Sequence, residues 1–418
     1  MPNESPTEID KIAYDAPLSF PEPSQAWKSK MGERENNRTE KLVYGKDVPI
    51  VDLKNKWIII SGANSGIGRE AALTFASWGA HLILACREPG PASREPHPVE
   101  VVEECKAAAR EGGHESTTIE WWRIDMADLG SIEAFGRRWL TTERPLDVLC
   151  NNAGVGSSPG KDGKEGVYLT KDGFEFIHQV RYHYSRLSTP YPNTYGPRDL
   201  HRADKTQINF LSHVLLTSML LPSLAKAEAP RIVCTTSCFH YLGQYDISNF
   251  NGGTELGQEG VGMYKNNKLY FQIWLTELQR RLLLHGEYKH ITVNGFHPGY
   301  VASGIWNINR AFWFRWLIVW ILMLMARFFG INCQQGSMAL VYIATAPECG
   351  PDPKKQGGKD ERGRGGGRYF NRIWQEEAMP HCRDADARCR VWRKVAEELK
   401  LKERGLLDVL GFYGGTSD

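Results

Sequence analysis

Tyr264 and Lys268 are the first residues of this chain whose types and spacing suggest chemistry, because they lie four positions apart in a segment predicted to be helical. On a helix, side chains at i and i+4 share a face, so the ammonium is placed beside the phenol. A phenol with a reference pKa of about 10 is a poor base at neutral pH, and a nearby ammonium stabilises its ionised form. The pair therefore suits proton exchange with a substrate oxygen. A chance pair on a helix is the alternative, since this spacing is common.

A glycine-rich stretch at residues 61–68 is the second chemical signal. It follows the apolar run 57–60 and opens a helix-compatible segment at 69–76. Glycine permits positive φ and close approach of the backbone, and the unpaired N–H groups at a helix start bind a pyrophosphate. This context predicts a dinucleotide site, rather than the alternative of an ordinary strand-to-helix turn. The residues expected to bind the dinucleotide are Gly62, Asn64, Ser65, Gly66, Ile67 and Gly68.

The elements that must position these residues are short apolar strands alternating with helical segments from Lys46 onward. Predicted strands follow the first one at 81–85, 118–124 and 146–150. This alternation is typical of an α/β protein with a Rossmann-type, doubly wound parallel sheet. We expect about seven strands in a single catalytic domain.

The residues that follow these strands indicate which dinucleotide is bound. An acidic residue after the second strand bonds the ribose 2′-hydroxyl of NAD, whereas an arginine accommodates the 2′-phosphate of NADP. Arg87 stands there, so NADP(H) is preferred over NAD(H), unless Arg87 is only a solvated surface charge. Asp125 follows the third strand, where its carboxylate can meet the adenine. The fourth strand leads into three further expected cofactor residues, Asn152, Ala153 and Gly154.

Together these motifs resemble the short-chain dehydrogenase/reductase family, over roughly residues 52–370. The chain most resembles its retinol-dehydrogenase-like and WW-domain-oxidoreductase-like branch. Ser237, at the end of the stretch 231–237, matches the family's catalytic serine, and Asn209 matches the asparagine of its catalytic tetrad. Tyr264 and Lys268 fit the family's Y-x-x-x-K.

The stretch 297–303 resembles the family's P-G-x-x-x-T segment, which covers the nicotinamide. The residues it is expected to contribute are Pro298, Gly299, Val301 and Ser303, where serine replaces the usual threonine.

The resemblance implies roles for the catalytic residues. Hydride transfer between the nicotinamide and a carbonyl carbon leaves a developing alkoxide, for which Tyr264 is the acid/base. Lys268 would also bond the nicotinamide ribose, Ser237 the substrate oxygen, and Asn209 a water that leads protons from Lys268 to solvent. We therefore expect an oxidoreductase that interconverts a carbonyl and an alcohol on a lipophilic small molecule. The alternative is an inactive dinucleotide-binding protein with a regulatory or redox-sensing role.

Composition narrows the remaining classes. The 418 residues carry a formal net charge of +2, which argues against nucleic acid as the main partner. The nine cysteines show neither C-x-x-C nor zinc spacing, so we expect reduced thiols in a cytosolic compartment and no metal site. The oligomeric state stays open, a homo-oligomer included.

Segments outside the motifs divide the chain further. We expect a flexible arm at residues 1–45 and the main part of the domain at 46–349. A Gly-rich charged loop is expected at 350–368, and the last strand and C-terminal helix of the same domain at 369–418. The stretch 311–330 is apolar and aromatic, but only 316–326 lacks charge, too short for a span of about 20 residues. It suits peripheral contact with an internal membrane or lipid droplet from the cytosol, or equally a lid over an apolar pocket.

Residues 180–207 interrupt what looks like one continuous helix of the family. They include three prolines, each of which costs a helix interior about 3 kcal/mol, and they show no apolar period. The codons of Val180 and Gln207 are compatible with splice signals, and 28 × 3 = 84 nucleotides keep the reading frame. We interpret the segment as a translated intron; a genuine surface loop is the alternative. If it is translated, Asn209 is expected to be displaced from the helix start.

Overall fold

The computed structural model describes residues 42–90, 93, 95–154, 172, 207–250, 260–301, 331–351 and 366–406. The strands are β1 Trp57–Ser61, β2 His81–Cys86, β3 Ile119–Arg123, β4 Val148–Asn151, β5 Arg231–Thr235, β6 Thr292–His297, β7 Arg368–Asn371 and β8 Trp374–Glu376. The helices are α3 Gly66–Ser77, α4 Pro98–Glu111, α5 Leu129–Leu140, α6 Ser212–Leu224, α7 Gly260–Leu284, α9 Cys333–Thr345 and α10 Ala385–Glu398. A π-helical turn, η3 Gln207–Leu211, precedes α6, and short 3-10 turns lie at η1 Gly45–Asp47, η4 Cys238–Leu242, η5 Ile247–Asn249, η8 Pro347–Cys349 and η9 Pro380–Cys382.

The eight strands form one sheet in the order β3-β2-β1-β4-β5-β6-β7-β8. The first seven in this order are parallel, and β8 pairs with β7 in the antiparallel direction. The predicted doubly wound parallel sheet is confirmed. The order reverses between β1 and β4, and in such sheets the ligand lies in the crevice at the carboxyl ends of the strands around this point.

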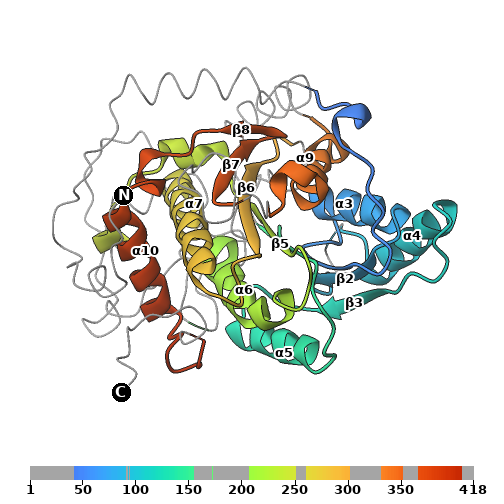
Figure 1. The fold of residues 1–418 in the computed structure, drawn as a ribbon, viewed down its shortest axis with the longest axis horizontal. Coiled ribbons are helices and arrows are strands. Elements are labelled where there is room, and N and C mark those ends of the chain that lie inside the picture. The colour runs from blue at the N-terminus through green and yellow to red at the C-terminus, as the bar shows by residue number, and fades with distance from the viewer. Residues whose placement is uncertain are drawn as a thin grey trace, which may run out of the picture.

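Helices cover both faces of the sheet (Figure 1). On one face, α3, α4 and α9 close a core that includes Ile58, Phe75 and Leu340. On the other, α5, α6 and α7 close a second core that includes Ile59, Leu215 and Trp274. The alternating residues of β1 serve the two cores in turn, which explains why the strand is almost continuously apolar.

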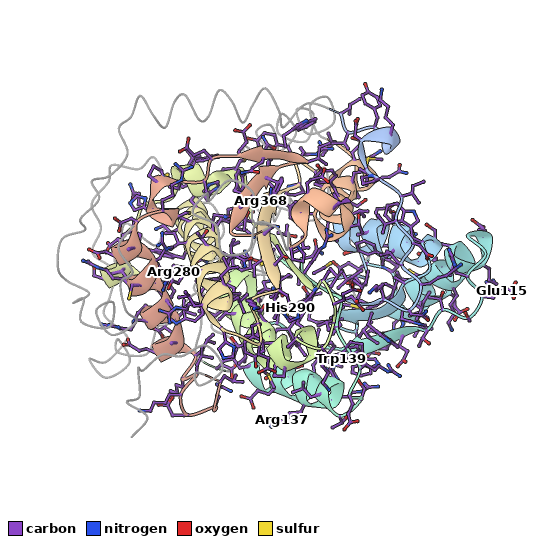
Figure 2. The ribbon with its side chains drawn as sticks, in the orientation of Figure 1. Glu115, Arg137, Trp139, Arg280, His290 and Arg368 are labelled. Atoms are coloured by element: carbon purple, nitrogen blue, oxygen red, sulfur yellow. The ribbon has the colours of Figure 1, made fainter. Side chains whose placement is uncertain are left out.

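The C-terminal helix α10 lies beside α7 (Figure 1). A buried cluster of charges joins the two helices. Glu277 on α7 is 1% exposed and bonds Arg280 and Arg281 of its own helix. It also accepts a hydrogen bond of 3.1 Å from Arg388 on α10. Arg280 is labelled in Figure 2. One carboxylate therefore neutralises charge on two helices, and the Arg281 guanidinium also lies over the Trp392 ring.

All nine cysteines belong to the described part of the chain, where none forms a disulfide and all but Cys333 are buried. Burial raises the pKa of the Cys86 and Cys234 thiols to about 12. These thiols are therefore protonated at neutral pH.

Several segments singled out from the sequence fall wholly or largely outside the described residues: the arm 1–45, the interruption 180–207, the apolar stretch 311–330 and the charged loop 350–368. Ser303 also lies outside them. Among the helices that are described, none combines the length and the apolar character needed to cross a membrane.

Candidate active site

The glycine stretch forms a tight turn between β1 and the first residue of α3. Gly62 has φ +68° and Gly66 φ +57°, conformations that other residues rarely adopt. A Cβ on Gly68 would lie 2.3 Å from the carbonyl oxygen of Gly62 and 2.7 Å from Nδ2 of Asn152. The turn is thus compatible only with glycine at these points, as expected of a backbone that closely approaches a pyrophosphate.

The residues after β4 are bound to this turn through Ser61. Its hydroxyl oxygen accepts hydrogen bonds from the backbone N–H groups of Asn152 and Ala153, at 2.9 and 3.0 Å. The side-chain amide of Asn152 donates to the Ser61 carbonyl at 3.1 Å, and its amide oxygen accepts from Thr235 Oγ1 at 3.3 Å. The ends of β1, β4 and β5 therefore form one hydrogen-bonded floor at the crevice.

At the end of β2, the expected 2′-phosphate partner Arg87 is exposed. Glu95, a residue of the loop between β2 and α4 that was not anticipated from the sequence, contacts the glycine turn. Its two carboxylate oxygens accept from Asn64 Nδ2 at 3.3 Å and Ser65 Oγ at 3.4 Å. Donors of the turn are thus arranged so that an anion can bind them, which fits a phosphate-bearing cofactor.

Asp125 lies after β3 as expected, but one of its carboxylate oxygens accepts from the backbone N–H of Ala127 at 2.9 Å. Asp125 lines a cavity of about 420 Å³ together with Arg123, Asp128, Ser131, Ala134, Phe135 and Arg138. One oxygen of Asp125 therefore stabilises the local turn, and adenine contact stays a prediction.

The predicted catalytic residues meet at the end of β5. The Ser237 hydroxyl is hydrogen-bonded to the Tyr264 phenol, and it also accepts from the backbone N–H of Phe239 at 3.2 Å. The Lys268 ammonium donates to the backbone carbonyl of Thr235 at 2.8 Å and lies 5.6 Å from the centre of the Tyr264 ring. The strand end and one face of α7 thus bring together serine, tyrosine and lysine.

The electrostatics of the pair differ from the expectation. Burial raises the pKa of Tyr264 to about 12, and the hydrogen bond from Ser237 offsets this only partly. Burial also lowers the pKa of Lys268 to about 8. The prediction that the ammonium lowers the pKa of the phenol is therefore wrong, because desolvation dominates and the charge of Lys268 is directed at the Thr235 carbonyl.

Asn209 is 2% exposed and lies in the π-helical turn η3, directly before α6. A Cβ added to Gly154 would lie 3.2 Å from Oδ1 of Asn209, so the Asn209 side chain lies against the segment that follows β4. The π turn that holds Asn209 leads directly into α6. The expectation that the preceding insertion displaces Asn209 stays a prediction, because residues 173–206 lie outside the described part of the chain.

The stretch after β6 approaches the glycine turn through α9. Gly299 has φ +92°, and Val301 forms a parallel bridge with Ile331. A Cβ on Gly336 of α9 would lie 2.6 Å from Val301 and 3.1 Å from Ile67. Val301 thus lies close to Ile67 of the turn, across Gly336, and Pro298 and Gly299 precede it in the same segment.

Three further side chains support this centre, and no sequence motif that we considered singled them out. His240 Nδ1 lies 2.7 Å from the Ser237 carbonyl, which can only accept, so this nitrogen carries the proton and holds the serine segment. His213 Nε2 lies 2.7 Å from the Ala153 carbonyl by the same logic. Arg372, fully buried, donates to the Gln335 carbonyl at 2.8 Å beside Gly299.

Within the ranges that the structure describes, no group of three or more His, Cys, Asp or Glu side chains is placed to hold a metal ion. The candidate site consists of a phosphate-compatible turn and a Ser-Tyr-Lys set.

Comparison with known proteins agrees with this geometry. A family model described as short chain dehydrogenase matches residues 56–168. A WW domain-containing oxidoreductase from Danio rerio is 30% identical over 356 residues, covering 83% of this chain and 69% of the relative. The chain belongs to the short-chain dehydrogenase family. The family and branch predicted from the motifs are confirmed.

A second relative within this family, retinol dehydrogenase 13 from Homo sapiens, is 28% identical over 359 residues, covering 84% of this chain and 86% of the relative. Among solved structures, an uncharacterized protein from Mycobacterium paratuberculosis aligns with a TM-score of 0.52 at 21% identity, covering 86% of this chain and 98% of that one. The latter supports the fold alone. As a short-chain dehydrogenase/reductase, the protein is an oxidoreductase that uses a nicotinamide dinucleotide.

Proposed function

We propose that this protein is an NADP(H)-dependent oxidoreductase that interconverts a carbonyl and an alcohol on a lipophilic small molecule. The observation that carries the proposal is the meeting of Ser237, Tyr264 and Lys268 at the end of β5, across the hydrogen-bonded floor from the glycine turn. The lipophilic character of the substrate is supported by the names of the relatives, which include retinol dehydrogenases.

The residues that would hold the dinucleotide are those of the turn, of the floor and of the segment after β6: Gly62, Asn64, Ser65, Gly66, Ile67, Gly68, Asn152, Ala153, Gly154, Pro298, Gly299 and Val301. When bound, the nicotinamide supplies or accepts the hydride. The protein's own part is to hold the carbonyl oxygen, to move a proton to or from it, and to keep the site dry.

The proton resides on Tyr264 in the reductive direction. Because burial keeps the phenol protonated at neutral pH, Tyr264 is ready to donate to a developing alkoxide. Ser237, already bonded to the phenol, is the donor that orients the substrate oxygen. Lys268 is the cation of the site. Asn209 lies in η3, directly before α6, and we infer that it anchors the proton path from Lys268.

The test is consumption of NADPH with a panel of long-chain aldehydes and ketones. Tyr264→Phe removes the proton donor, so kcat should fall by about 10²–10⁴-fold while the Kd of NADPH changes little. Tyr288→Phe, in the turn that follows α7, is the matched control and should retain the parental rate. Equal rates for Tyr264→Phe and the parent would refute the acid/base assignment; NADPH binding without turnover of any carbonyl would favour an inactive, redox-sensing protein.

Preference for NADP(H) rests on Arg87, the exposed cation at the end of β2. Arg87→Asp should weaken NADPH binding and leave NADH binding within a factor of about two, since only NADPH carries the 2′-phosphate. Equal losses for both dinucleotides would contradict the role of Arg87.

From the sequence alone, we further infer peripheral contact of the protein with an internal membrane or lipid droplet, on the cytosolic side, through residues 311–330. Their aromatic ends and flanking arginines suit the interface between lipid and water. Cell fractionation should find part of the protein with membranes and release it with mild detergent. A protein that stays entirely in the supernatant would leave the interpretation as a pocket lid.

A further inference from the structure

The carboxylate of Glu95 lies where a dinucleotide-binding turn would receive an anion. It accepts from the side chains of Asn64 and Ser65, two consecutive residues of the turn that leads into α3. Its own segment, between β2 and α4, is the one that begins with Arg87. The acidic residue that contacts the turn and the basic residue that follows β2 thus belong to the same loop.

The register of the sheet indicates which part of a bound dinucleotide Glu95 would lie near. Ser61 of β1 pairs with Ala85 of β2, so the turn after β1 and the residues after β2 lie side by side. The backbone N–H of Asn64 is hydrogen-bonded to the Cys86 thiol, the neighbour of Arg87. Burial, and after it the charge of Glu95, raises the pKa of Cys86 to about 12, so the carboxylate is close to the end of β2. In this fold the end of β2 faces the 2′ position of the adenosine ribose.

We propose that Glu95 is a selectivity residue that opposes a phosphate at the 2′ position and so offsets the attraction of Arg87. This inference rests on the proposed function, because it concerns the choice of that function's cofactor. An ionised carboxylate only accepts hydrogen bonds, so it tolerates a ribose 2′-hydroxyl but repels a 2′-phosphate. To admit NADP(H), the Glu95 side chain must release Asn64 and Ser65.

Adenosine fragments isolate this effect from the chemistry at the other end of the site. Binding of 2′,5′-ADP and of 5′-AMP is measured by titration calorimetry at about 50 mM salt, because exposed charges are screened at higher ionic strength. Glu95→Gln keeps the shape and an acceptor oxygen while it removes the charge. We expect 2′,5′-ADP to bind about tenfold more tightly to this variant and 5′-AMP to change by less than about twofold.

Glu88→Gln is the matched control, because Glu88 is an exposed carboxylate of the same loop, placed 3.8 Å from His97 rather than on the turn. It changes the net charge equally and should leave the ratio of the two affinities unchanged. The same shift in both variants, an equal gain for both fragments, or weaker binding of 2′,5′-ADP to Glu95→Gln would overturn the proposal.

The outcome also separates this inference from the function on which it rests. If the parent binds NADPH and reduces carbonyls while Glu95→Gln leaves the ratio of the fragment affinities unchanged, only the role of Glu95 is refuted. If neither fragment nor NADPH binds the parent or the variants, the proposed function and this inference fail together.

Discussion

The ammonium of Lys268 donates a 2.8 Å hydrogen bond to the backbone carbonyl of Thr235, the last residue of β5. The bond holds the ammonium at the end of the strand, 5.6 Å from the centre of the Tyr264 ring. Because the group is buried and the Thr235 carbonyl is uncharged, this bond offsets only part of the cost of removing the ammonium from water.

This geometry predicts an alkaline limit to activity. Burial lowers the pKa of Lys268 to about 8, so the ammonium is present below that pH and lost as pH rises through it. We expect kcat/KM for NADPH, which reports groups of the free enzyme, to be flat from pH 6 to 7.5 and to fall above about pH 8. Initial rates of carbonyl reduction across pH 6–10 measure it. A profile that stays flat to pH 10 would show that the charge of Lys268 is not required.

Gly68→Ala should destabilise the protein by about 1–3 kcal/mol, as overpacking does elsewhere. A helical Gly→Ala change normally gains up to about 1 kcal/mol, but here the new Cβ would lie 2.3 Å from a backbone oxygen, so the clash prevails. Urea unfolding measures the difference, and NADPH affinity should fall with it. Gly286→Ala, where a Cβ would meet nothing within 4 Å, is the control and should change stability by less than about 0.5 kcal/mol. Equal stability of the two variants would show that the turn can yield.

Glu277→Gln should cost about 3–5 kcal/mol of unfolding free energy, because it removes the carboxylate that three arginines share on two packed helices. Thermal or urea unfolding is the measurement. Glu111→Gln, an exposed residue at the end of α4, controls for the change in net charge. A loss of less than 1 kcal/mol in Glu277→Gln would mean that water screens the cluster.

Acid should unfold the protein through buried histidines. Burial lowers the pKa of His213 and His240 to about 4 and that of His297 to about 3, below the ordinary 6.5. The unfolded chain therefore binds more protons between pH 6.5 and 4, so stability is complete above pH 6.5 and lost as pH falls. Each histidine contributes a slope of up to about 1.4 kcal/mol per pH unit.

The slope can be assigned to one residue. In urea titrations between pH 6 and 4.5, His213→Phe should reduce the slope of unfolding free energy against pH, whatever it does to absolute stability. Phe271→Leu alters the ring stacked on His213 without removing a titrating group. This variant should change the unfolding free energy at every pH by the same amount and keep its slope against pH. An unchanged slope in His213→Phe would mean that this imidazole is already protonated when folded, or accessible to water.

Features that depend on residues close together in the sequence could be predicted from it, whereas contacts between distant segments could not. The glycine turn and the pair Tyr264 and Lys268 are local patterns, so residue types and spacing sufficed to find them. The role of Thr235 as the acceptor for Lys268 follows from the packing of α7 against η4 and β6, next to the end of β5, which no local pattern carries. The error about the Tyr264 pKa has the same origin: spacing on a helix gave the neighbour, but desolvation depends on the whole surrounding core.

Glu95 and Asn209 illustrate two other limits. Glu95 reaches the turn from a loop without an apolar period, so its sequence context gave no signal. Asn209 is expected to be displaced because 28 residues interrupt the helix before it, and the structure describes only the π turn of five residues that holds Asn209 and leads into α6. Sequencing cDNA across 180–207 still decides whether the segment is translated, because it lies almost wholly outside the described residues.

The burial of eight cysteines makes the rate of thiol labelling a measure of how often the native structure opens. Because the thiolate is the reactive form, an added alkylating reagent can modify these side chains only after the chain opens. Cys86 and Cys234 lie beside the site, whereas Cys389 lies on α10 and Cys382 in η9 next to it. Mass spectrometry of a labelling time course therefore compares two regions in one experiment. If a dinucleotide slows labelling of the first pair alone, the opening it suppresses is local; if it slows both equally, the molecule opens as a whole.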